Sequence, residues 1–216
     1  QQYKTIEKKS GIRFYTEVGT LSVGTEKYYA DLINTSHKID FEYLTQEDLD
    51  IPSDYPHINI PKESKLIFEP KNAGHISARK LVQAQKNIFT LNKGSYIDDF
   101  VTNINKSKDI FHLKTNQNST ILAKQVVICT GGFTNFTDIL KGKLPLEVLG
   151  RTVLLGEVQD KYVDELQKYP SLIYKPKGQE DTYCLPAIRY PNSKSYIKIG
   201  WSHFIKINSY TESIRW

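Results

Sequence analysis

Apolar residues recur along the chain with two different spacings, which together predict a fold of mixed helices and strands. The clearest helix is predicted over 75–91, where Ile76, Leu81, Ala84 and Ile88 lie on one face, and Gly94 follows as a stop signal. Weaker helical patterns cover 1–10, 26–36, 136–140 and 160–166.

Short runs rich in β-branched and aromatic residues predict the strands. They lie at 13–16, 20–23, 41–44, 65–69, 95–101, 109–114, 119–122, 125–129, 151–158, 172–174, 182–185 and 195–201. The first two flank Val18-Gly19, which predicts a hairpin or two neighbouring strands. A polar link at 116–118 predicts a second hairpin. Three prolines in 51–61 predict an extended loop, and Thr45 with Asp48 matches a capping box.

The stretch from Lys124 to Asn135 (KQVVICTGGFTN) has a pattern of its own. An apolar run over 125–129 stops at Thr130-Gly131-Gly132. Such a run suits a buried parallel strand, and glycines at its carboxyl end allow a ligand to approach the backbone closely. The alternative is an ordinary strand followed by a Gly-Gly turn.

The order of elements indicates an α/β (α+β) fold. A helix, a strand, a hairpin and a return strand come first, and a series of strands divided by Pro and Gly turns follows Pro145. Strands that follow an α/β section favour an antiparallel sheet in a second lobe.

Composition and charge exclude several classes of protein. The chain has 216 residues, 39% hydrophobic and 25% charged, which suits one sizeable core or two small lobes. The net charge of +5 is scattered, without the basic footprint of a nucleic-acid-binding protein. No apolar run approaches the roughly 18 residues of a membrane span. Two cysteines within apolar runs indicate reduced thiols in an intracellular protein, and the five histidines lack metal-ligand spacing.

Two absences suggest an internal fragment of a longer protein. The sequence contains no methionine, even at position 1. It also contains no GxGxxG pattern, the motif that places a dinucleotide's pyrophosphate at a helix N-terminus.

Six short motifs in collinear order nevertheless match one family. The chain resembles the amine-oxidising flavoproteins of the D-amino-acid-oxidase superfamily, in particular the sarcosine and pipecolate oxidases, from about Gly11 to about His203. The motifs are TEVGTLSVG (16–24), EPKNAG (69–74), YIDDF (96–100), VVICTGGFTN (126–135), PLE (145–147) with Arg151, and YCLP (183–186) with KIGW (198–201).

The resemblance implies a set of residues that bind FAD. Ile97 matches a residue whose backbone contacts the adenine, and Cys129, Thr130 and Gly131 match the turn beside the diphosphate and ribose. Phe133 takes the place of a bulky residue after the glycines. For Ile97 and Phe133, plain core packing is the alternative.

The resemblance also implies catalytic residues. Tyr183 matches a tyrosine that directs its hydroxyl at the bound amino acid, although any of the 14 tyrosines can be structural. Lys198 matches a lysine over the flavin face that helps O2 accept electrons, since a fixed cation stabilises developing negative charge. Its alternative is a solvent-facing lysine on an amphipathic strand.

The histidine of the family departs from the pattern. It usually follows the aromatic residue directly, but this chain has Ser202 there and His203 one position later. A shift of one residue turns a side chain to the opposite face of a strand. Either a bulge re-aims His203, or the role is absent or taken by Ser202. The family's carboxylate-binding arginine would precede Gln1.

As a whole, the resemblance implies part of an oxidase that converts a sarcosine-like or pipecolate-like amino acid with FAD and O2, giving H2O2. A part of a Rossmann-like FAD domain with a β-meander would cover 65–142, and an antiparallel substrate-binding domain would cover 1–64 and 143–216. The expected protein is a monomer in the cytoplasm or peroxisome, with no nucleic-acid or membrane partner. The alternatives are a fructosyl-amino-acid oxidase, an amine dehydrogenase, or a non-catalytic binding module that has lost flavin.

Overall fold

A computed structural model describes residues 2–39, 42–137 and 139–215, which form two compact units. Unit 1 comprises Gln1–Gly94 and Arg151–His203, and unit 2 comprises Ser95–Gly150 and Phe204–Trp216. Each unit is described by itself below.

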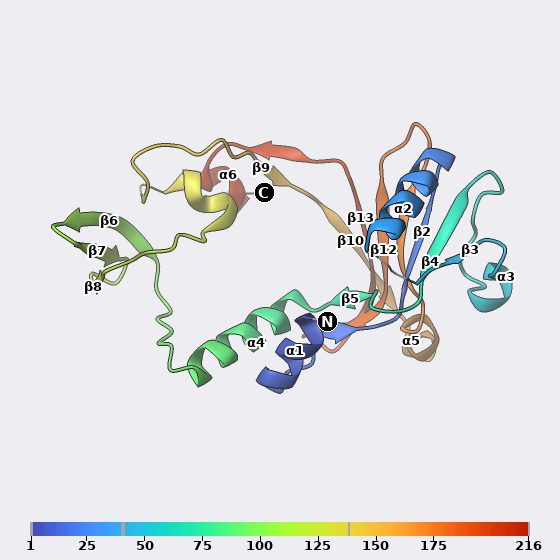
Figure 1. The fold of residues 1–216 in the computed structure, drawn as a ribbon, viewed down its shortest axis with the longest axis horizontal. Coiled ribbons are helices and arrows are strands. Elements are labelled where there is room, and N and C mark those ends of the chain that lie inside the picture. The colour runs from blue at the N-terminus through green and yellow to red at the C-terminus, as the bar shows by residue number, and fades with distance from the viewer. Residues whose placement is uncertain (1, 40–41, 138, 216) are drawn as a thin grey trace. The chain divides into compact units, whose positions relative to one another are not determined.

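Unit 1 is built on a seven-stranded sheet (Figure 1). All neighbouring strands are antiparallel except β2 and β11, which pair in parallel. The sheet therefore joins early and late segments of the chain, and the predicted antiparallel lobe takes in strands from both. Its strands, in spatial order, are β10 (Val153–Val158), β13 (Ser195–Trp201), β12 (Thr182–Arg189), β11 (Ser171–Lys175), β2 (Thr20–Gly24), β4 (Lys65–Glu69) and β3 (Leu44–Thr45).

The core of unit 1 lies on both faces of β2 and β4. Leu21, Val23 and Leu66 pack with Ile51 in one buried cluster on one face. The register pairs Ser22 with Ile67, and side chains alternate along a strand, so these two lie on the other face. Helix α2 (Glu26–Ile39) contacts β2 and β4 and lies beside the sheet in Figure 1. Burial on two faces explains the nearly continuous apolar run of each strand.

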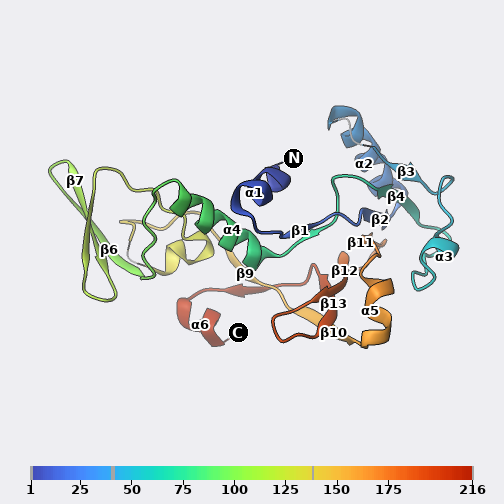
Figure 2. The ribbon, with the colours of Figure 1, turned by 90° about the horizontal axis from the view of Figure 1, so that it is seen from below.

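The longest predicted helix starts three residues later than its pattern suggested. Helix α4 (Ala78–Leu91) begins after Ser77, whose hydroxyl accepts a hydrogen bond from the Lys80 N–H. The preceding residues form β5 (His75–Ile76), which pairs with β1 (Tyr15–Thr16). Helix α1 (Gln2–Ser10) lies beside α4 (Figure 2), and the Asn87 amide donates to the Ser10 carbonyl at 2.7 Å.

Two predictions for the first seventy residues were wrong. The runs around Gly19 form neither a hairpin nor neighbouring strands, because β1 pairs with β5 whereas β2 pairs with β4 and β11. The predicted loop over 51–61 begins with a short helix, α3 (Ile51–Asp54), because Asp50 caps it and proline is tolerated in a first helical turn. Asp48 does bind the Thr45 N–H and hydroxyl, but a turn follows instead of a helix.

Unit 2 contains the predicted β-meander. Strands β6 (Val101–Ser107), β7 (Ile110–Thr115) and β8 (Thr120–Ala123) pair consecutively, and Asn118 in the β7–β8 turn has a φ of 59°. The predicted strand covered 95–101, whereas β6 begins at Val101. The sequence of β6 is mostly polar, so it carries little of the apolar pattern that predicts a strand. The remaining elements are η1 (Gly131–Phe136), β9 (Val148–Gly150), β14 (Ile205–Ile207) and α6 (Tyr210–Arg215), with β9 paired to β14.

The predicted return strand over 125–129 is not formed. Residues 125–130 are coil, and Val127 is 86% exposed. No strand of the described part of unit 2 pairs with this segment, and an isolated strand has no ladder to satisfy its backbone groups. The helix predicted over 136–140 is also wrong in its described part. A 3₁₀ helix covers Gly131–Phe136 instead, where the Thr134 hydroxyl donates to the Gly131 carbonyl at 2.7 Å.

The borders of the units also differ from the predicted domain ranges. Strand β4 belongs to the large sheet and α4 packs on α1, so the border falls after Gly94 instead of after position 64. The last residues, Phe204–Trp216, fall in unit 2 because β14 pairs with β9. Helix α5 (Asp160–Leu166) matches its predicted bounds within unit 1.

Stability should depend strongly on the buried face of β4. Ile67 is 1% exposed, so Ile67→Ala should lower the free energy of unfolding by about 2–5 kcal/mol, through lost burial and a residual cavity. Urea denaturation followed by circular dichroism measures the change. The matched control is Ile97→Ala, where the side chain is 56% exposed and the cost should stay below about 1 kcal/mol. Equal costs at the two positions would contradict the assigned core.

Candidate active site

Two predicted catalytic residues come together on one face of the β12–β13 hairpin. The register pairs Tyr183 with Gly200 and Leu185 with Lys198. Residues that face each other across an antiparallel pair share a face of the sheet, as do residues two apart on one strand. Tyr183, Leu185, Lys198 and Gly200 therefore lie on the same face.

Gly200 leaves the space that the Tyr183 ring occupies. A Cβ at position 200 would lie 2.4 Å from Cε1 and 2.6 Å from the hydroxyl oxygen of Tyr183. Any larger residue at 200 would force the ring to move. The glycine of the KIGW motif thus fixes the place of the tyrosine hydroxyl on the sheet.

Lys198 is a half-buried cation among apolar side chains. It pairs with Leu185 on β12 and with Leu155 on β10, so a leucine flanks it on either side. Its Nζ lies 5.7 Å from the centre of the Tyr183 ring, within the range of a cation–π contact. A partly desolvated ammonium stabilises nearby negative charge more strongly than one in water. This position differs from that of a fully solvent-facing lysine on an amphipathic strand.

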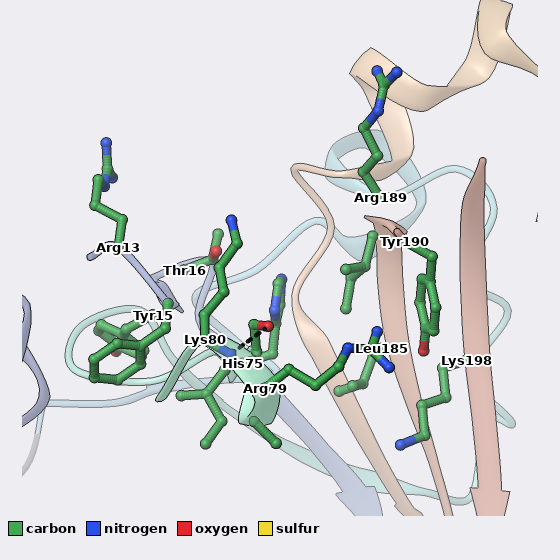
Figure 3. A pocket seen from close by; sticks show the side chains of 15 residues that line it. Arg13, Tyr15, Thr16, His75, Arg79, Lys80, Leu185, Arg189, Tyr190 and Lys198 are labelled. Atoms are coloured by element: carbon green, nitrogen blue, oxygen red, sulfur yellow. Dashed lines mark hydrogen bonds between the residues drawn. The ribbon is translucent and has the colours of Figure 1, made fainter. Parts of the chain in front are cut away.

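A cavity of about 410 Å³ lies within unit 1 beside Lys198 (Figure 3). Its walls come from β1, β5, the first turn of α4 and the β12–β13 hairpin. The Arg79 guanidinium carbon lies 5.5 Å from the centre of the Tyr190 ring, and that ring packs edge-on against Tyr196 at 5.3 Å. His75 also lines the cavity, and burial lowers the pKa of its imidazole, which favours the neutral form.

His203 lies away from this cluster. It follows β13 in a coil, where its Nδ1 lies 3.3 Å from a carboxylate oxygen of Glu180, and both side chains are about half exposed or more. No bulge re-aims it, because Trp201 is the last paired residue of β13, opposite Thr182. The neighbouring Ser202 donates its N–H to the Asp181 carbonyl at 2.8 Å.

The residues predicted to bind FAD all lie in unit 2. Cys129 and Ile97 are exposed on coil segments. Thr130 bonds to the Thr134 hydroxyl at 2.8 Å, and Phe133 packs against Tyr210 with ring centres 6.2 Å apart. Gly131 has a φ of +57°, and no atom lies within 4 Å of where its Cβ would be.

The open backbone at Gly131 fits the close approach that a diphosphate needs. The exposed coil that leads to it fits less well, since the expected return strand is missing there. The structure thus brings together Tyr183 with Lys198 in unit 1, and Thr130, Gly131 and Phe133 in unit 2.

Sequence reasoning missed Arg79 and Tyr190. Arg79 lies in the first turn of α4, and Tyr190 directly follows β12. The two residues are more than a hundred positions apart in the sequence, and only the tertiary fold places both of them at one cavity. The sequence held only a weak signal for a functional role of Arg79, namely its position two residues after the capping Ser77.

The described residues contain no group of three or more His, Cys, Asp or Glu side chains able to hold a metal ion. No helix in the described ranges has the length and apolarity required to cross a membrane.

The fold of this chain is similar to that of several solved structures. NikD, an unusual amino acid oxidase essential for nikkomycin biosynthesis, superposes with a TM-score of 0.65 at 16% identity, over 96% of this chain and 54% of its own. Iminodiacetate oxidase from Chelativorans sp. BNC1 superposes with 0.64 at 13% identity, over 99% and 57%. Glycine oxidase from Geobacillus kaustophilus superposes with 0.58 at 15% identity, over 99% and 56%.

The chain has the fold of part of an amino acid oxidase. It spans just over half the length of each of these three proteins. No protein-family profile and no curated protein sequence matches it. The likeness is therefore one of fold, and it agrees with the resemblance that the sequence motifs indicated.

The packing of Tyr183 on Gly200 can be tested by substitution. Gly200→Ala should lower the free energy of unfolding by about 1–3 kcal/mol, because the new methyl group overlaps the ring. In a Tyr183→Ala background the same change should cost almost nothing. Denaturant unfolding of the four-member mutant cycle measures this coupling.

Gly156→Ala is the control for that cycle. Gly156 lies in the edge strand β10, and no atom lies within 4 Å of where its Cβ would be. The added methyl group should therefore leave stability within about 1 kcal/mol of the parent. A Gly200→Ala cost that persists without the Tyr183 ring would contradict the proposed contact.

Proposed function

We propose that the protein to which this chain belongs is an FAD-dependent oxidase acting on the C–N bond of a secondary or cyclic amino acid. O2 is the electron acceptor and H2O2 the product. The observation that carries the proposal is the placement of Lys198 and Tyr183 on one face of the β12–β13 hairpin, 5.7 Å apart from ammonium to ring centre. The fold shared with three amino acid oxidases supports it.

Lys198 is proposed to assist the reduction of O2. Electron transfer to O2 creates negative charge, and a cation held in advance stabilises that charge without reorganisation. Leu155 and Leu185 flank Lys198 on the neighbouring strands, so apolar side chains border the ammonium on both sides of its strand. This arrangement favours an oxidase over a dehydrogenase, since a dehydrogenase has no need to activate O2.

Tyr183 is proposed to orient the substrate. A neutral phenol donates a hydrogen bond to a carboxylate. The Tyr183 ring and hydroxyl fill the space that Gly200 leaves on the sheet, so the place of the hydroxyl is set before the substrate binds. Such preorganisation reduces the entropy lost on binding.

The FAD would be held by unit 2, which we propose to be part of the flavin domain, and unit 1 would be part of the substrate domain. Ile97 would contact the adenine through its backbone, Cys129, Thr130 and Gly131 would line the diphosphate and ribose, and Phe133 would pack behind the turn. When bound, FAD supplies the two-electron acceptor for the amine. For His203 we propose no direct contact with the substrate, because its imidazole already pairs with the Glu180 carboxylate.

Lys198→Met in the complete protein should slow reoxidation of the reduced flavin by O2 roughly 10²-fold, because it removes the preorganised charge. Reduction of the flavin by the amine should change far less. Stopped-flow absorbance measures the two half-reactions separately. Lys62→Met, at an exposed lysine outside the sheet, is the control. Equal slowing of both half-reactions would contradict the role proposed for Lys198.

Tyr183→Phe should lower kcat/KM for the amino acid about ten- to hundredfold, the loss of one hydrogen bond to a charged group, with FAD still bound. Steady-state kinetics and the flavin absorbance of the purified variant provide the two readouts. Tyr162→Phe, at a 43% exposed tyrosine of α5, should change neither. Loss of flavin from Tyr183→Phe would instead indicate a structural tyrosine.

A further inference from the structure

Positively charged side chains predominate among the charged residues that line the cavity beside Lys198. No aspartate or glutamate is among the described residues that line it. Cationic residues reach its walls from four different elements or their flanks: Arg13, Arg79, Lys80, Arg189 and Lys198. A cleft lined by charges of one sign attracts ligands of the opposite sign.

The nearest carboxylates along the chain already have other partners. Glu7 accepts hydrogen bonds from the Tyr15 and Phe14 N–H groups, which, together with the charge of Arg13, hold the pKa of its carboxyl below the ordinary value. Glu17 binds Lys4 and the Asn72 N–H, and Glu157 binds Lys194. Within the described ranges, none of the five cavity cations forms an ion pair with a carboxylate. An anionic ligand is the kind of partner that such a cavity attracts.

Two of the lining side chains lie close together. In Figure 3 the Arg79 guanidinium extends from α4 toward Leu185 and Tyr190, whereas the Lys198 ammonium extends from β13 toward the lower part of the view, away from the Tyr190 ring. The Tyr190 ring stands between these elements, 5.5 Å from the guanidinium carbon. The charged ends of Arg13, Lys80 and Arg189 point toward the top of Figure 3, away from the Arg79 guanidinium. A planar guanidinium and a phenol together offer donors that a carboxylate accepts.

We propose that Arg79 and Tyr190 bind a carboxylate group of a small ligand. This inference rests on the proposed function for its identity: the group is the second acidic group of a dicarboxylic amino acid substrate. Tyr183, the proposed partner of the first carboxylate, does not line the cavity, whereas Lys198 both lines it and contacts the Tyr183 ring. A substrate held at Tyr183 thus extends past Lys198 into the cavity, whose volume of about 410 Å³ suits a small molecule.

Direct binding tests the cavity without any need for catalysis. The complete purified protein is titrated with succinate by isothermal calorimetry, with the neutral succinamide as the uncharged counterpart. Succinate should bind and succinamide should not. Arg79→Gln should weaken succinate binding about tenfold, since one charged hydrogen-bonding partner is lost, and Arg79→Lys should recover part of the loss.

Lys62→Gln is the matched control, because it removes the same charge from an exposed site outside the cavity. It should change the dissociation constant less than twofold. If Arg79→Gln and Lys62→Gln have equal effects, or if succinamide binds as well as succinate, the proposed carboxylate site is overturned.

Turnover by the complete protein tests the identity of the ligand. The ratio of kcat/KM for an N-methylated dicarboxylic amino acid to that for the monocarboxylic amino acid of the same length should exceed one. Arg79→Gln should lower this ratio about tenfold, mainly through KM, and Lys62→Gln should leave it unchanged. A ratio unaffected by Arg79→Gln overturns the inference and leaves the oxidase proposal standing. A protein that binds succinate at Arg79 but oxidises no amine overturns the oxidase proposal instead.

Discussion

The parallel pairing of β2 with β11 is the contact on which the rest of unit 1 depends. It joins Thr20–Gly24 to Ser171–Lys175, and so connects the N-terminal strands to the hairpins that carry Tyr183 and Lys198. The buried Leu21 and Val23 pack against Leu172 and Tyr174 across this pair. Because the two strands lie about 150 residues apart in the chain, their pairing closes a long loop, which the hydrophobic burial on both sides must offset.

That sheet provides a rigid support for the candidate active site. The β12–β13 register fixes Tyr183 over Gly200 and Lys198 between two leucines, so each polar group is positioned by backbone pairing instead of by a loop. The cavity then forms where the first turn of α4 meets the same hairpin. Groups on strands and helix starts hold their geometry more closely than groups on loops, which is what orientation of a substrate requires.

Unit 2 shows the opposite case. Its meander forms from local hairpins, and its turn at Gly131 keeps an open backbone, but residues 125–130 remain coil with Val127 86% exposed. The VVIC run has the composition of a buried strand and lacks a strand to pair with in the described part of the chain. β-branched apolar residues favour a strand only when a neighbour supplies the hydrogen bonds and the burial.

The sequence by itself determined the local elements and the motifs. The KLIFE strand, helix α5, the end of α4 and the β7–β8 turn all follow from apolar spacing, caps and turn residues, which act within a few positions of one another. The motifs with Lys198 and Tyr183 likewise pointed to an amino acid oxidase fold. Only the tertiary structure decided that β1 pairs with β5, that β4 joins the large sheet, and that Arg79 and Tyr190 share a cavity with Lys198. Those outcomes depend on contacts between distant segments, for which periodicity along the chain carries no signal.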